Sequence, residues 1–69
     1  MRITYDKDVD ALYIEISDKK AVESEEVEKD IIFDYDENDN IVGIEVLNCV
    51  KENKDKILPA LKEIGKVLA

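Results

Sequence analysis

Apolar and polar residues alternate in two stretches near the start of the chain, at residues 1–6 and 11–17. In the second stretch Leu12 and Ile14 fall on one side of an extended backbone and their neighbours fall on the other. A period of two residues is typical of a half-buried β-strand. Because mostly charged residues separate the two stretches, we expect a β-hairpin with its turn at residues 7–10.

The same layout recurs thirty positions later, where Tyr5-Asp6 is matched by Tyr35-Asp36 and residues 14–16 are matched by residues 44–46. The repeat predicts a second hairpin. Its turn, residues 36–40, contains no glycine. Asparagine and aspartate tolerate the left-handed backbone conformation that such a turn usually needs.

The segment between the hairpins is rich in glutamate, and its second half alternates again. We interpret residues 22–35 as one long strand that is bent or bulged near Lys29 and Asp30. A last strand over residues 41–47 would close the sheet. The predicted sheet is therefore a four-stranded antiparallel meander built from two similar hairpins.

The apolar spacing changes near residue 53. Ile57, Leu61, Ile64 and Leu68 are four, three and four positions apart, which is typical of an amphipathic helix. A proline fits best in the first turn of a helix, so Pro59 predicts that the regular helix starts near Asp55. We expect a single α+β domain over residues 1–69, with the sheet in 1–50 and one C-terminal helix, at about 53–68, packed on one face.

The composition narrows the choice of partner and location. The net charge is −8, from 18 acidic and 10 basic residues, so nucleic acid and anionic membranes are not expected as partners. No apolar run approaches the ~20 residues that span a bilayer. Cys49 is the single cysteine, which excludes a disulfide within the chain. With an opening that lacks a signal pattern, the chain is expected to be cytoplasmic.

Several short motifs bear a family resemblance: Tyr5-Asp6, Asp10-Ala11-Leu12-Tyr13-Ile14, Asp34-Tyr35-Asp36 and Val42-Gly43-Ile44-Glu45-Val46-Leu47. In these the chain resembles the family numbered twenty-two eighty-three among the domains of unknown function, which are small prokaryotic proteins. The resemblance covers about residues 1–49. It implies a small β-sheet domain without assigned catalytic residues, acting as an antitoxin that pairs with a small toxin-like protein. The chain departs from the family pattern at Asn40, where glycine is usual, and the C-terminal helix lies outside the pattern.

The sharpest candidate for metal binding is a partial calcium-loop template in the second hairpin. Its acidic and amide positions are Asp34, Asp36, Asn38 and Glu45. Position six of the template requires glycine and holds Asp39, and the flanking segments are predicted strands rather than helices. We therefore interpret this segment as an Asx-rich turn, and we expect no metal and no cofactor.

Catalysis by a nucleophile lacks its usual parts, because the chain has no histidine to activate Ser17, Ser24 or Cys49. Glu15 and Glu45 occupy equivalent positions of the two hairpins, so a carboxylate- or metal-dependent small enzyme stays an alternative. The chain is not expected to be an enzyme.

Two surfaces are candidates for binding. The sheet face away from the helix combines apolar and charged residues, and we expect a second copy of the chain to cover it at Tyr13, Ile32, Ile41 and Leu47. An acidic partner patch is formed by Glu23, Glu25, Glu26 and Glu28. The predicted function is that of a small acidic protein-binding module, antitoxin-like, that forms a homodimer and pairs with a small basic protein. A self-associating structural subunit is the remaining alternative.

Overall fold

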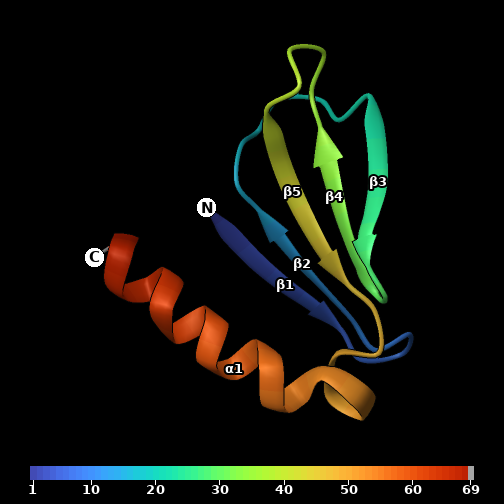
Figure 1. Cartoon of the computed structure of the whole chain (residues 1–69), viewed down its shortest axis with the longest axis vertical. Helices are drawn as coiled ribbons and strands as arrows, with labels where there is room; N and C mark the ends of the chain where they lie inside the picture. Colours follow the sequence, from blue (N-terminus) through green and yellow to red (C-terminus); the bar gives the residue numbers. More distant parts are fainter. Residues whose placement is uncertain (69) are drawn as a thin grey trace.

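A computed structural model describes the backbone of residues 1–68; within the last helix it describes the side chains of residues 49–57, 59 and 62. Five antiparallel strands form one sheet, which is followed by one helix (Figure 1). The elements are β1 (Arg2–Asp6), β2 (Ala11–Glu15), β3 (Glu23–Glu28), β4 (Ile31–Tyr35), β5 (Ile41–Val46) and α1 (Cys49–Leu68). The strand order across the sheet is β1-β2-β5-β4-β3. The predicted α+β class with an antiparallel sheet and a C-terminal helix is confirmed.

The repeat seen in the sequence is a structural repeat. The hairpin β1–β2 and the hairpin β4–β5 lie side by side, because β2 pairs with β5 at the centre of the sheet. Ile14 lies opposite its own equivalent, Ile44. Around this pair the registers match: Ile3 lies opposite Ile14 in one hairpin, and Phe33 lies opposite Ile44 in the other. The two hairpins are therefore related by an approximate twofold axis normal to the sheet.

The prediction of four strands is wrong, because residues 22–35 form a hairpin and not one long strand. Glu28 lies opposite Ile31, and Lys29 and Asp30 form the turn between β3 and β4. Asp30 has a φ of 69°, a left-handed conformation that lets the chain reverse without glycine. The predicted bulge exists, but it lies within β3, between Glu26 and Glu28.

The predicted meander is also wrong, because β5 lies between β2 and β4. The segment after β2 crosses one end of the sheet to reach the far edge, where β3 begins (Figure 1). At this end the backbone carbonyl of Val42 accepts hydrogen bonds from the N–H groups of Ile16 and Ser17, at 2.9 and 3.2 Å. Val42 is the extra residue of a bulge in β5, since Asp34 lies opposite Gly43 and Tyr35 opposite Ile41.

The core lies on one face of the sheet, between β2, β5 and the start of α1. Leu12, Ile14, Val46 and Cys49 form a buried cluster, and Ile57 of α1 packs against it. This contact confirms that the helix meets the predicted face through its described side chains. Of the predicted apolar stripe, the side chains of Leu61, Ile64 and Leu68 lie outside the described residues. In Figure 1 the helix runs along the β1 side of the sheet, away from β3.

The helix begins at Cys49, earlier than the predicted start near Asp55, and Pro59 lies in its interior. The reason is a cap supplied from the first hairpin. The backbone carbonyl of Asp10 accepts from Cys49 N–H at 3.1 Å, and its carboxylate accepts from the N–H groups of Val50 and Lys51 at 2.9 and 3.1 Å. Helix N-termini leave such donors without partners, so Asp10 stabilises this helix start.

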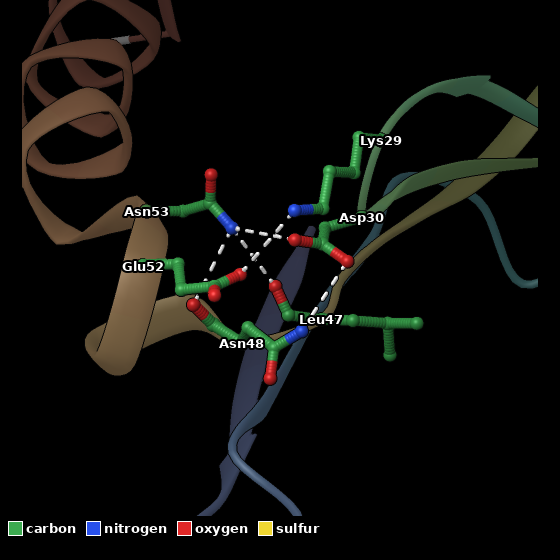
Figure 2. A network of polar contacts seen from close by, with 6 residues as sticks. All are labelled: Lys29, Asp30, Leu47, Asn48, Glu52 and Asn53. Atoms are coloured by element: carbon green, nitrogen blue, oxygen red, sulfur yellow. Dashed lines mark hydrogen bonds and ion pairs between the residues drawn. The ribbon is translucent and has the colours of Figure 1, made fainter.

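A second aspartate from another turn joins the helix to the sheet (Figure 2). The carboxylate of Asp30 accepts from the side-chain amides of Asn48 and Asn53, each at 3.3 Å. Asn53 is buried and also donates to the backbone carbonyl of Leu47 at 3.1 Å. Both turns at this end of the sheet therefore hold the start of α1.

The hydrogen bonds to Asp10 predict a pH dependence of stability. Donation from Val50 N–H, then from the Tyr5 hydroxyl and Lys51 N–H, lowers the pKa of the Asp10 carboxyl. The stabilisation is full above the unfolded pKa of about 3.9 and is lost as pH falls through the lower folded pKa. Asp10→Asn should lower the melting temperature at pH 7, and the difference from wild type should shrink as pH falls below the unfolded pKa of about 3.9. A constant difference from pH 7 to pH 2 would contradict this role.

Candidate functional site

The face of the sheet opposite the core is uncovered within the described residues, and we call it the open face. Its central row consists of Thr4, Tyr13, Glu45 and Ile32, which lie opposite one another across β1, β2, β5 and β4. Tyr13, Glu45 and Ile32 are half-buried. In this row the Glu45 carboxylate lies between the side chains of Tyr13 and Ile32.

A polar network crosses the open face from β2 to β3. The Tyr13 hydroxyl donates to Asp34 Oδ2 at 3.1 Å, and the Ser24 hydroxyl donates to Asp34 Oδ1 at 2.6 Å. The Tyr13 ring reaches Asp34 by lying over Gly43, where a Cβ atom would overlap the ring and its hydroxyl. Burial, followed by the hydrogen bond to Asp34, raises the pKa of Tyr13. A Cβ atom at position 43 would therefore force the Tyr13 ring to move.

The network lies where the internal repeat is broken. Tyr13 and Gly43 are equivalent positions of the two hairpins, as are Thr4 and Asp34. The first hairpin supplies the tyrosine. The second hairpin supplies the glycine over which its ring lies and the aspartate that accepts its hydrogen bond. The repeat is visible in the sequence, but the sequence does not show that the positions where the two hairpins differ, Tyr13, Gly43 and Asp34, are in contact.

A shallow hollow lies beside Tyr13 on the open face. Residues lining it include Thr4, Asp6, Lys7, Ala11, Tyr13 and Glu45. Among the described residues no lysine or arginine forms an ion pair with Asp6 or Glu45, whereas Glu15 pairs with Arg2 at 3.4 Å. The hollow therefore places two carboxylates and one lysine next to an aromatic ring.

The four residues predicted for a dimer interface are not gathered into one patch. Tyr13 and Ile32 flank Glu45 on the open face. Ile41 lies opposite Tyr35, because the bulge at Val42 shifts the register, and pairing with Tyr35 places it on the core side of the sheet. Leu47 follows β5 at the end of the sheet, and its side chain points away from the polar network of Asp30 (Figure 2).

The predicted acidic patch is an edge strand. Glu23, Glu25, Glu26 and Glu28 all belong to β3, and every residue of this strand is exposed. By register Glu25 shares a side with Phe33, and Glu26 shares the other side with Ile32. The charges therefore line both sides of one edge, where they also oppose pairing with another strand.

The residues of the calcium template lie apart in the fold. The Asp36 carboxylate accepts from the N–H groups of Asn40 and Asn38, at 3.0 and 2.8 Å, and these hydrogen bonds lower its pKa. Asp34 bonds to the network of the open face. Glu45 is four residues along β5 from the turn, roughly 13 Å away at the usual strand rise. Among the described residues no group of three or more acidic, cysteine or histidine side chains could hold a metal ion.

Two further candidates have structural partners. Cys49 is buried in the core, and burial raises the pKa of its thiol, which makes the reactive thiolate less accessible. The Tyr5 hydroxyl donates to Asp10 at 2.7 Å, and this hydrogen bond is the main reason that the pKa of Tyr5 is raised to about 12. Both groups support the helix start rather than form a reactive centre.

The fold and the open face define a small α+β domain with an antiparallel sheet and an acidic surface. A family model described as "Protein of unknown function (DUF2283)" matches residues 2–49, and the chain belongs to this family. The resemblance seen in the sequence is thereby confirmed. Comparisons with curated proteins and with solved structures gave no match. Within the part of the chain that the structure describes, no helix has the length and apolar composition needed to cross a membrane.

The contact between Tyr13 and Gly43 predicts non-additive substitutions. Tyr13→Phe removes the hydrogen bond to Asp34 and should lower the free energy of unfolding by about 0.5–1.5 kcal/mol. In a Gly43→Ala background the added methyl group displaces the ring, so the same substitution should have almost no further effect. Urea denaturation of the four proteins measures this coupling. Equal effects of Tyr13→Phe in both backgrounds would show that the ring does not depend on Gly43.

The geometry of the second turn predicts a weak response to calcium. Millimolar calcium should leave the melting temperature almost unchanged, because the Asp36 carboxylate already accepts backbone hydrogen bonds. Thermal melts with calcium and with an equal ionic strength of sodium chloride make the comparison. A saturable increase that Asp36→Ala abolishes would reveal a calcium site.

Proposed function

We propose that this domain is a protein-binding module that takes a small basic protein on its open face, with the acidic patch of β3 guiding the encounter. The observation that carries the proposal is the central row of the open face. There the half-buried Tyr13 and Ile32 flank Glu45 and offer apolar contact area beside negative charge. Apolar anchors supply most of the affinity at interfaces, and complementary charge supplies specificity.

The charges favour a basic partner over a second copy on this face. Two copies placed face to face would bring together two surfaces that each carry Glu45, Asp34 and Glu26. Like charges brought together at an interface are strongly unfavourable. Self-association through Tyr13 and Ile32, expected from the apolar surface alone, is therefore the weaker of the two candidates.

The carboxylate-enzyme alternative has less support. Glu15 and Glu45 both lie on the open face, but Glu15 is held by Arg2 at 3.4 Å, and Glu45 lies opposite Tyr13 and Ile32. An acid–base pair needs two carboxyl groups in contrasting environments around a reaction space. A binding role for this face accounts for its apolar residues as well as its charges. An antitoxin-like role, in which the basic protein is a small toxin encoded beside this one, is the specific form of the proposal.

The test separates the two surfaces by kinetics. Replacing Glu23, Glu25, Glu26 and Glu28 by glutamine should slow association with the adjacently encoded basic protein, and higher salt should slow the wild type similarly. Ile32→Asp should mainly speed dissociation, because it removes an apolar anchor. Stopped-flow fluorescence over a range of salt concentrations measures both rates.

The control is a variant with the same net charge but an intact patch. Asp8→Asn, Asp18→Asn, Glu37→Gln and Asp55→Asn together neutralise four exposed carboxylates outside β3. This variant should associate nearly as fast as the wild type. Equal slowing in both variants would show that net charge alone guides the encounter. Failure of the wild type to bind the basic protein would remove the proposal.

A further inference from the structure

The two edges of the sheet differ in a way that bears on self-association. The β3 edge carries four glutamates and a bulge, both of which oppose pairing with another strand. The β1 edge, with the sequence Arg-Ile-Thr-Tyr-Asp, is regular over all five of its pairs with β2. All five of its residues are exposed, although α1 runs along this side of the sheet (Figure 1).

The sequence of β1 is complementary to itself when two copies run antiparallel. With Thr4 opposite Thr4, Arg2 of each copy lies opposite Asp6 of the other while it keeps its ion pair with Glu15 of its own chain. In the same register Ile3 lies opposite Tyr5. Parallel pairing in register would instead place each charge opposite its like. Opposite charges facing each other across strands stabilise a pair, and like charges destabilise it.

The side chains on both sides of β1 also suit pairing with a second copy of the strand. Ile3 and Tyr5 lie opposite Ile14 and Leu12 of β2 and so belong to the core side, whereas Arg2, Thr4 and Asp6 belong to the open face. Ile3 and Tyr5 are 48% and 45% exposed, which is apolar area available for burial. Pairing would therefore join apolar residues on one side and complementary charges on the other.

From this geometry we propose that β1 pairs with β1 of a second copy, antiparallel and centred on Thr4, to form a continuous ten-stranded sheet across a twofold axis. The occupant of this edge is thus a second copy of the chain, through a surface different from the open face. The axis is normal to the sheet, so both open faces lie on the same side of the dimer. The inference does not depend on the proposed function.

Charge-reversal variants test the register. Arg2→Glu places a glutamate opposite Asp6, and Asp6→Lys places a lysine opposite Arg2; the symmetry of the dimer doubles each repulsion. Each single variant should raise the dimer dissociation constant at least about tenfold relative to wild type. Sedimentation equilibrium at roughly 0.15 M salt measures the constants.

Mixing the two single variants gives the decisive result. Arg2→Glu and Asp6→Lys chains are complementary to each other at both ends of the strand, so an equimolar mixture should form a 1:1 heterodimer by native mass spectrometry. The double variant should recover the wild-type dimer. Glu25→Lys and Lys54→Glu change the charge equally at exposed positions away from β1 and should leave the dimer intact.

Hydrogen exchange locates the contact. Amides of β1 should exchange more slowly as protein concentration rises, while amides of β3 should not change. A monomeric wild type at high concentration, or single variants that dimerise like the wild type, would overturn the proposal. Loss of the dimer in Tyr13→Asp with no loss in Arg2→Glu would assign self-association to the open face instead.

Discussion

The capping of α1 by Asp10 is the interaction on which the arrangement of sheet and helix depends. A helix N-terminus exposes backbone donors that need partners, and here the first three are satisfied by one residue of the first hairpin. The cap lies about forty residues before the helix and joins the first hairpin to the start of α1. Asp30 adds a second attachment from another turn through Asn48 and Asn53. These contacts place Cys49 in the core and direct Ile57 onto it.

The same aspartates and asparagines also shape the backbone. The four described non-glycine residues with positive φ are Asp10, Asp30, Asp39 and Asn48. Three of them lie at the end of the sheet where α1 begins. Short polar side chains tolerate the left-handed conformation and offer oxygens or amides to nearby backbone, whereas glycine offers only the conformation. The residues that reverse the chain at that end are therefore the ones whose polar groups hold the helix.

Because the same polar residues both reverse the chain and hold the helix, only part of the fold could be predicted from the sequence. Alternation and the repeat correctly located both hairpins and their turns, because those signals are local. The turn at Asp30 was mistaken for a bulge, because aspartate is a weaker sequence signal for a chain reversal than glycine. The start of the helix was placed too late because Pro59 was assigned to the first turn, whereas it lies in the helix interior and the cap comes from the distant Asp10. The insertion of β5 between β2 and β4 depends on pairing partners, which alternation alone does not specify.

For the candidate site too, local features could be predicted from the sequence and contacts between distant residues could not. The mixed character of the open face could be predicted from alternation, and the acidic patch from composition. The contact of Tyr13 with Gly43 and Asp34 could not, because it joins positions thirty and twenty-one residues apart that look unrelated in sequence. In a sheet built from two similar hairpins, a departure from the repeat marks a place where one copy must accommodate the other. The tyrosine, the glycine and the aspartate form such a place, and they lie beside the row that we propose for partner binding. The exceptions to the repeat therefore give this face a specific shape, whereas the repeat itself supplies the sheet that carries it.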